Sequence, residues 1–331
     1  MADLFSLAAT QEAQGRRRQM LRTAFGPSIA AALADPTVLE VMVNPDGKLW
    51  IDRATDGRKD SGERIASTET ERIIRLVAAH VRREVHDKAP IVSAELPETG
   101  ERFEGVMPPV SPAPCFSIRK PADVIYRLAD YVNANILTPR QAVLLTTAVI
   151  ERRNIVVVGG TSSGKTTLVN ALLAEIALHG ERVVILEDTR ELRCAAEDCV
   201  TLRTKPGVAS LADLVRSTLR LRPDRIVVGE VRGPEALDML KAWNTGHPGG
   251  ITTLHANSAA AALVRLEQLV QEAVVTVPHA LIAEAVDLLV FINGRGAQRR
   301  VESLLELEGL NDDGSYILKP MGVPVLRPVA S

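Results

Sequence analysis

The chain has 331 residues, of which 46% are hydrophobic and 24% charged, and its formal net charge is -2. These values fit a globular protein with room for two domains, and they give no overall attraction to nucleic acid or to an anionic membrane. No apolar stretch reaches the roughly 20 residues of a bilayer-spanning helix, and the N-terminus lacks the pattern of a secretory signal. The three cysteines form no even framework, which predicts a cytoplasmic protein.

The first part of the chain, residues 1–120, predicts a small α+β domain. Strands are expected at residues 38–43 and 48–51 because a turn-forming Asn-Pro-Asp-Gly sequence separates two strand-like segments. Thr68 and Glu71 have the spacing of a capping box, which predicts the start of a helix.

A second hairpin is expected at residues 103–107 and 115–118, around a proline-rich turn. Residues 121–138 are predicted to be a linker. The remaining residues, 139–331, alternate strands and helices, a pattern typical of a mostly parallel sheet. The strand-like segments after Asn293 have no role that the sequence assigns.

The most informative segment follows an apolar strand at residues 155–158. It fits the phosphate-loop pattern G-x-x-x-x-G-K-[ST] between a buried strand and a helix. Backbone N–H groups and the helix N-terminus would hold phosphates, Lys165 would reach the β- and γ-phosphates, and the Thr166 hydroxyl would bind Mg²⁺. The chain is therefore predicted to bind a nucleoside triphosphate with Mg²⁺ through Gly159, Gly160, Thr161, Ser162, Ser163, Gly164, Lys165, Thr166 and Thr167.

Two later strands also end in acidic residues. The strand at residues 182–186 leads into three of them, Glu187, Asp188 and Glu191. Carboxylates at this edge of a sheet suit metal binding and water activation, although a solvated loop is the alternative. The strand that begins at Arg225 ends in Gly229-Glu230, with glycine where many nucleotide hydrolases have aspartate. Glu230 is therefore expected either to hold Mg²⁺ through water or to position the attacking water.

A glycine-rich loop then leads to a short strand that ends at His255. The spacing of His247 and His255 fits no zinc site. For His255 we therefore favour a hydrogen-bonding role, sensing the γ-phosphate or orienting Glu230, over metal binding; taken by itself, a structural histidine would be the default.

Four sequence boxes occur in order over residues 155–260: GGTSSGKTT, ILEDTREL, RIVVGEVRG and TGHPGGITTLHANS. In this combination the chain resembles the traffic ATPases of type IV secretion and conjugal transfer, within the secretion-ATPase superfamily. It looks especially like the conjugal-transfer TrbB proteins. One departure is Ser162, where the family more usually has glycine. If that position needs a positive φ, serine costs of order 1 kcal/mol.

The resemblance implies an α/β architecture with a C-terminal RecA-like P-loop domain and a smaller N-terminal PAS-like domain. It implies that ATP binds between the domains and that the subunits form a hexameric ring. Glu230 is then the Walker B acid and Glu191 the general base, while Glu187 and Asp188 support the water shell of Mg²⁺. His247 and His255 form the histidine box. Contacts with the γ-phosphate are implied for Arg102, Arg119 and Arg222, with Arg220 as the competitor of Arg222.

The expected function is an ATP-hydrolysing motor that energises conjugal transfer, type IV secretion or pilus biogenesis from the cytoplasmic face of a channel. Inner-membrane channel components are the expected partners, with peripheral membrane contact left open and no sequence-specific binding of nucleic acid. The alternatives are a pilus assembly, retraction or tight-adherence ATPase, a RecA-like DNA translocase and a nucleotide-gated scaffold. The 3% aromatic content disfavours the translocase, because single strands need stacking platforms. The intact acids disfavour the scaffold.

Overall fold

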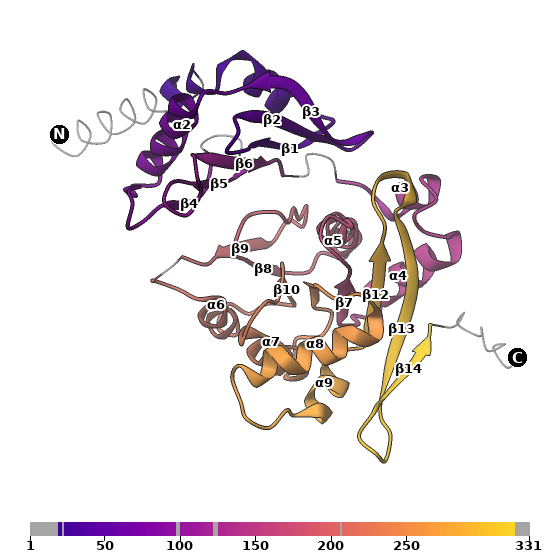
Figure 1. Cartoon of the computed structure of the whole chain (residues 1–331). Helices are drawn as coiled ribbons and strands as arrows, with labels where there is room; N and C mark the ends of the chain where they lie inside the picture. The colour runs from indigo at the N-terminus through magenta and orange to yellow at the C-terminus, as the bar shows by residue number, and fades with distance from the viewer. Residues whose placement is uncertain (1–18, 22, 97–99, 122–124, 206, 322–331) are drawn as a thin grey trace, which may run out of the picture. The chain divides into compact units, whose positions relative to one another are not determined.

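The computed structural model describes residues 19–21, 23–96, 100–121, 125–205 and 207–321. The chain divides into two compact units, residues 1–123 and 124–331, and each has its own sheet (Figure 1).

The N-terminal unit contains a six-stranded antiparallel sheet in the order β3-β2-β1-β6-β5-β4. Its strands are β1 (Val38–Val43), β2 (Lys48–Arg53), β3 (Gly57–Arg64), β4 (Ile91–Glu95), β5 (Arg102–Val106) and β6 (Cys115–Arg119). Both predicted hairpins, β1–β2 and β5–β6, are confirmed. Along β5 and β6 buried residues such as Phe103 and Ile118 alternate with more exposed ones, so one face of these strands contributes to the core.

Helix α2 (Ser67–His80) supplies Ile73, Ile74 and Val77 to the same core, together with residues 23–34, which are also helical. The helix begins at Ser67, two residues before the start that an N-cap at Thr68 implies, and its N-cap, Ala66, makes no side-chain capping hydrogen bond. The predicted capping box is therefore wrong. Glu71 binds Arg75 one turn later at 2.8 Å instead.

The C-terminal unit contains an eight-stranded sheet in the order β14-β13-β12-β7-β11-β10-β8-β9. From β12 to β9 all neighbouring strands are parallel, and β13 and β14 add an antiparallel extension. This confirms the prediction of a mostly parallel sheet. The strands are β7 (Ile155–Val158), β8 (Val183–Glu187), β9 (Cys199–Arg203), β10 (Arg225–Val228), β11 (Ile251–Leu254), β12 (Leu288–Asn293), β13 (Arg300–Leu310) and β14 (Tyr316–Pro320).

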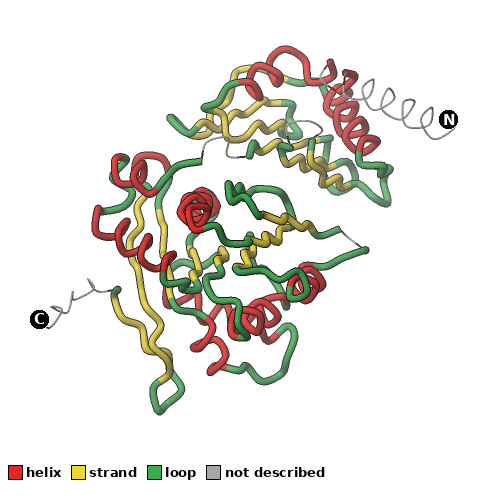
Figure 2. Tube along the Cα trace, turned by 180° about the vertical axis from the view of Figure 1, so that it is seen from behind, coloured by secondary structure: helices red, strands yellow, loops and turns green. Residues whose placement is uncertain are grey.

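Helices cover both faces of this sheet (Figure 2). One core lies beneath α3 (Leu128–Asn133), α4 (Pro139–Ile150) and α5 (Lys165–Ile176), which continues into the 3₁₀ turn η1 (Ala177–His179). The other core lies beneath α6 (Leu211–Thr218), α7 (Glu235–Asn244), α8 (Ala259–Gln271) and α9 (His279–Ala285). A second 3₁₀ turn, η2 (Gly296–Gln298), joins β12 to β13.

Part of the segment expected as a linker lies in the first of these cores, since Leu128, Tyr131 and Leu137 are buried there. Strands β7, β8, β10 and β11 are buried along their whole length, as strands of a covered parallel sheet are. Their carboxyl ends meet at one edge, where the phosphate loop, Glu187, Glu230 and His255 follow these strands. Within the described residues, no helix combines the length and the apolar character needed to cross a bilayer.

Candidate functional site

The phosphate loop joins β7 to α5, as the sequence predicts. Gly164, the N-cap of α5, has φ 97°, and Ser162 has φ 63°. The position of Ser162 therefore does require a positive φ, and serine is strained there.

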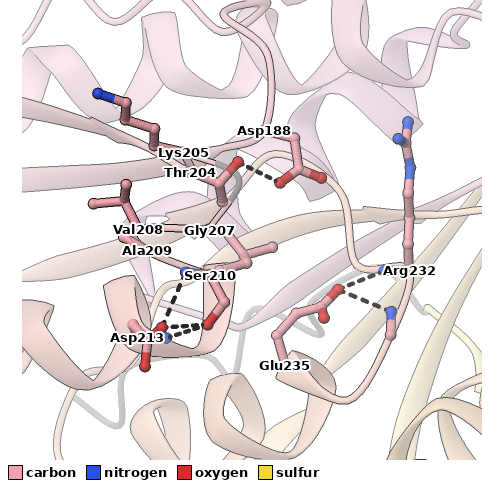
Figure 3. A pocket seen from close by; sticks show the side chains of 12 residues that line it. Asp188, Thr204, Lys205, Gly207, Val208, Ala209, Ser210, Asp213, Arg232 and Glu235 are labelled. Atoms are coloured by element: carbon pink, nitrogen blue, oxygen red, sulfur yellow. Dashed lines mark hydrogen bonds between the residues drawn. The ribbon is translucent and has the colours of Figure 1, made fainter. Parts of the chain in front are cut away.

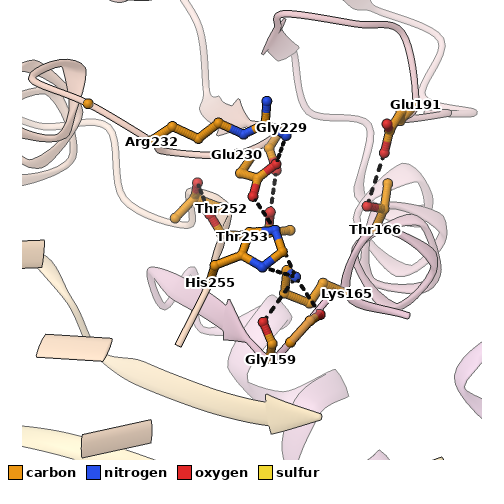
Figure 4. Close-up of polar contacts among 12 residues, drawn as sticks. Gly159, Lys165, Thr166, Glu191, Gly229, Glu230, Arg232, Thr252, Thr253 and His255 are labelled. Atoms are coloured by element: carbon orange, nitrogen blue, oxygen red, sulfur yellow. Dashed lines mark hydrogen bonds and ion pairs between the residues drawn. The ribbon is translucent and has the colours of Figure 1, made fainter. Parts of the chain in front are cut away.

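Lys165 turns its side chain back over the loop (Figure 4). Its ammonium group donates to the carbonyl oxygens of Gly159 at 3.0 Å and Gly160 at 2.9 Å, and its side chain is buried. It also lies 3.3 Å from Nδ1 of His255. The ammonium group of Lys165 is thus held against the loop that is expected to bind phosphates.

His255, at the end of β11, connects Lys165 with Glu230. Its Nε2 lies 2.7 Å from Oε1 of Glu230. The Lys165 ammonium lies at similar distances from both ring nitrogens, 3.3 Å from Nδ1 and 3.4 Å from Nε2. Because the same ring touches both groups, the geometry supports the role in orienting Glu230, one of the two roles that the sequence offers.

The other carboxylate oxygen of Glu230 pairs with Arg232. Asp188 and Glu191 also lie near enough for their charges to act on this arginine. No sequence motif distinguishes Arg232 from the other arginines of this region. Only the structure places it near three acids, Glu230, Asp188 and Glu191.

Glu191 lies beside Thr166, whose hydroxyl donates to Oε2 of Glu191 at 3.2 Å. Asn170, one turn further along α5, holds the same segment. Its side chain donates to the carbonyl of Glu191 at 3.3 Å and accepts from the amide of Arg193 at 2.9 Å. Sequence reasoning missed this buried asparagine. A polar residue on the apolar side of α5 was the signal that could have revealed it.

Glu187, at the end of β8, fills the space beside Gly229. A Cβ atom at Gly229 would lie 3.0 Å from Cγ of Glu187, so any larger residue there would press on this side chain. Oε1 of Glu187 accepts from the amides of Glu191 at 2.9 Å and Leu192 at 2.7 Å. Burial raises the pKa of Glu187 to about 7. Many nucleotide hydrolases have an aspartate at the position of Gly229. In this chain the space beside Gly229 holds the side chain of Glu187, from the end of the neighbouring strand β8.

These residues fit Mg²⁺. Oε2 of Glu187 is buried without a hydrogen-bond partner among the described residues, and the nearby donors are hydroxyl and carboxylate oxygens, which this hard cation prefers. The described part of the chain contains no cluster of three or more His, Cys, Asp or Glu side chains able to hold a metal by itself.

Asp188, the residue after Glu187, has different partners. It accepts a hydrogen bond from Thr204 at 2.9 Å and borders a hollow of about 580 Å³ that Arg232 and the loop before α6 also line (Figure 3). Its expected role in the water shell of the metal stays a prediction.

His247 lies at the opposite end of β11 from His255, and its Nδ1 is 3.3 Å from the carbonyl oxygen of Ala242 in α7. Within one chain the two histidines of the box are therefore not brought together.

Arg102 and Arg119 are direct neighbours across β5 and β6. Glu95 and Glu40 are the next partners on either side, in β4 and β1, so two acids flank the basic pair. Sequence reasoning selected the two arginines separately, and the structure brings them together in the N-terminal unit.

Arg222 and Arg220 are exposed in the segment that precedes β10. This segment lies at the amino edge of the sheet, where Arg182 donates to the carbonyl of Leu221 at 2.9 Å. The phosphate loop lies at the carboxyl edge. Within a single chain, Arg222 consequently does not reach the nucleotide that this loop would hold, and the predicted contact requires a second copy.

Comparison with solved structures supports the fold. The crystal structure of the pilus retraction motor PilT with bound ADP matches 92% of this chain and 84% of its own chain, with a TM-score of 0.58 and 19% sequence identity. At that identity the likeness is one of fold. The PAS-like character of the N-terminal unit stays a prediction.

Comparison with curated proteins adds closer relatives. The conjugal transfer protein TrbB of Rhizobium radiobacter is 48% identical over 88% of this chain and 91% of its own length. The probable conjugal transfer protein TrbB of Sinorhizobium fredii is 49% identical over 87% of this chain and 89% of its own. The family model described as type II/IV secretion system protein matches residues 27–305. The chain therefore belongs to the family of type II/IV secretion system proteins, as its four boxes predict.

Proposed function

We propose that this chain is an ATP-hydrolysing motor that energises conjugal transfer or type IV secretion. The observation that carries the proposal is the continuous contact from Lys165 through His255 to Glu230, with Thr166 and Glu191 beside it. The sequence relatives, which are conjugal transfer proteins, support the choice of machine.

In the proposed reaction a water oxygen attacks the γ-phosphorus of ATP, and the bond to the oxygen that bridges the β- and γ-phosphates breaks. Glu191 accepts the proton of the water, and ADP and phosphate are released. Lys165 exchanges the carbonyls of Gly159 and Gly160 for phosphate oxygens and neutralises part of their charge.

Mg²⁺ would be held by Thr166 and, through water, by Glu230 and Glu187, and when bound it would neutralise charge on the phosphates. His255 links the two ends of this arrangement. When Lys165 moves onto a γ-phosphate, His255 loses the ammonium as a neighbour while it stays bound to Glu230. The position of Glu230 thus depends on whether the γ-phosphate is present.

Further cationic groups that neutralise the γ-phosphate would come from the N-terminal domain and from a neighbouring subunit of a ring. Arg102 and Arg119 are proposed to neutralise the γ-phosphate from the N-terminal domain (residues 1–120), which a linker (residues 121–138) connects to the ATPase domain (residues 139–331). Arg222 is proposed to act in a neighbouring subunit, because it lies at the opposite edge of the sheet from its own phosphate loop. A hexamer that contacts inner-membrane channel components from the cytoplasmic side is the proposed assembly.

The test is Mg²⁺-dependent ATP turnover by the purified full chain, with the mass of the assembly measured on the same samples. Glu230→Gln is expected to lower turnover by about 100-fold or more while ATP binding persists. Arg119→Ala is expected to lower turnover less, by about tenfold, and only in assembled rings. Glu175→Gln, on α5 but away from these contacts, is the matched control. Wild-type turnover by Glu230→Gln would refute the proposal.

The same variants test the biological role in a mating experiment. Donor cells that carry Glu230→Gln as their sole copy are expected to lose plasmid transfer, whereas Glu175→Gln donors keep it. Normal transfer by donors whose protein cannot hydrolyse ATP would separate the enzyme from the proposed machine.

A further inference from the structure

The turn between β12 and β13 lies against the phosphate loop. The sequence assigned no role to this region. In the structure, Arg295 donates to the carbonyl of Thr161 at 3.2 Å, near the middle of the loop. Arg299 touches the end of the loop, where a Cβ atom at Gly164 would lie 2.9 Å from its Nε and 3.1 Å from its Cζ. Two arginines of one turn thus border the loop.

The two arginines differ in what they bind. Arg295 already uses a donor on a loop carbonyl, so it supports the loop. Nε of Arg299 is buried and has no hydrogen-bond partner among the described residues. A buried N–H donor without an acceptor is costly, and an arginine cannot relieve that cost by losing its charge. The surroundings of Arg299 therefore lack an acceptor that a bound anion would supply.

The neighbours of Arg299 favour an anion. Gly164 is the N-cap of α5, where unpaired backbone N–H groups and the helix dipole attract negative charge. The buried phenol of Tyr131 in α3 lies near enough for the charge of Arg299 to act on it, and burial raises the pKa of Tyr131, so this neighbour is uncharged at neutral pH. Arg299 therefore adds a positive charge to the loop at the end away from the carbonyls that Lys165 holds.

We propose that Arg299 is a nucleotide-binding residue that donates to the phosphates shared by ADP and ATP. This inference rests on the proposed nucleotide-binding function of the loop. Lys165 reaches toward His255 and Glu230, the side proposed for the γ-phosphate, whereas Arg299 reaches the loop at the start of α5. An arginine here binds ground state and transition state alike, so it sets affinity and not the rate of the chemical step.

The test compares Arg299→Met with wild type in titrations with ADP and with a non-hydrolysable ATP analogue. Methionine keeps much of the apolar stem against Gly164 and removes the charge. We expect the Kd of both nucleotides to rise about tenfold, by similar factors, because a charge-assisted hydrogen bond to phosphate is lost. In steady-state turnover the KM for ATP should rise while kcat stays within about twofold. Arg299→Lys should recover part of the affinity.

Arg300→Met is the matched control in the same turn, because the Arg300 side chain donates to the carbonyls of Ala297 at 2.9 Å and Arg299 at 2.6 Å, within the turn itself. If Arg299→Met binds ADP as wild type does while Arg299→Ala binds weakly, the side chain only packs against the loop and the inference is wrong. An equal loss in Arg300→Met would also refute it. If wild type binds neither nucleotide although circular dichroism shows that it is folded, the proposed nucleotide-binding function of the loop is wrong, and the inference about Arg299 fails with it.

Discussion

At the amino edge of the C-terminal sheet, polar groups find partners within the chain, whereas at the carboxyl edge several do not. Arg225, 1% exposed, pairs with Glu181 and donates to the carbonyl of Val149 at 2.8 Å. Asn154 binds the amide of Gly250 and the carbonyl of Ala285, both at 2.8 Å, and so ties the starts of β7 and β11 to the end of α9. These contacts hold the sheet.

At the carboxyl edge, four buried polar atoms have no hydrogen-bond partner among the described residues: Oγ of Ser163, Oε2 of Glu187, Oε1 of Glu230 and Nε of Arg299. Oε1 of Glu230 has the His255 ring 2.7 Å away as an ion-pair neighbour. All four belong to the phosphate loop or to segments that border it. Buried polar groups are usually satisfied, so such a cluster indicates groups that await a ligand. We infer that the amino edge stabilises the sheet, whereas the carboxyl edge keeps hydrogen-bond donors and acceptors available for the nucleotide.

The largest expected effect is at the amino edge. Arg225→Met removes the arginine but leaves the carboxylate of Glu181 mostly buried, with Arg152 as its remaining cation. Breaking such a pair costs about 3–5 kcal/mol, so the free energy of unfolding measured with urea should fall by that amount. Arg265→Met, at a half-buried position of α8 where the side chain donates to Gln268 at 3.1 Å, is the control. An unchanged urea midpoint for Arg225→Met would contradict the structural role of this edge.

Glu187 and Glu181 should respond to pH with opposite signs. Burial raises the pKa of Glu187 from 4.5 to about 7, so its contribution to stability is fully present below about pH 4.5 and is lost as the pH rises through 7. At about pH 8 without nucleotide, Glu187→Gln should therefore be more stable than wild type by of order 2–3 kcal/mol. Near pH 4.5 this difference should vanish.

Glu181 provides the matched comparison. Burial acts to raise its pKa, but Arg225 and Arg152 outweigh burial and hold the pKa below its usual value. Its contribution is present above its ordinary pKa and is lost as the pH falls through the lowered one. Glu181→Gln should thus be less stable than wild type at about pH 8. Thermal unfolding at both pH values gives the test, and a change of the same sign in both variants would undermine the comparison between the edges.

Much of the carboxyl edge could be predicted from the sequence, because motif spacing encodes it directly. The phosphate loop, the strand that leads to Glu230 and the strand that ends at His255 depend on local patterns of apolar, glycine and acidic residues. The two hairpins of the N-terminal unit were predictable for the same reason.

Contacts between distant segments could not be predicted. Nothing near Asn170 in the sequence indicates that it would bind the backbone of Glu191 and Arg193, since the chain returns to α5 only through the fold. The same is true of Glu187 beside Gly229, which depends on the pairing of β8 with β10. The capping box was wrong because Glu71 has an alternative partner one helical turn away.

Asn170 allows a test of positioning at the carboxyl edge. Asn170→Ala should leave nucleotide affinity unchanged but lower kcat about tenfold, because the segment that carries Glu191 loses both of its hydrogen bonds to the Asn170 side chain. Asn170→Asp keeps the acceptor for Arg193 but cannot donate to Glu191, so it should be intermediate or worse. Asn244→Ala, which removes a surface hydrogen bond to Glu284, is the control. Equal kcat values for Asn170→Ala and wild type would show that Glu191 needs no such support.

The smallest expected effect concerns the strain in the phosphate loop itself. Ser162 has φ 63°, so Ser162→Gly relieves a left-handed conformation that a side chain disfavours. The relief, of order 1 kcal/mol, exceeds or balances the extra chain entropy of glycine in the unfolded state, so the melting temperature should stay level or rise by a few degrees. Ser163→Gly, at the next position, has no positive φ to relieve and should lower it. An equal decrease in melting temperature for both glycine variants would show that the backbone of Ser162 carries no strain. The carboxyl edge would then differ from the amino edge only in its unpartnered side chains.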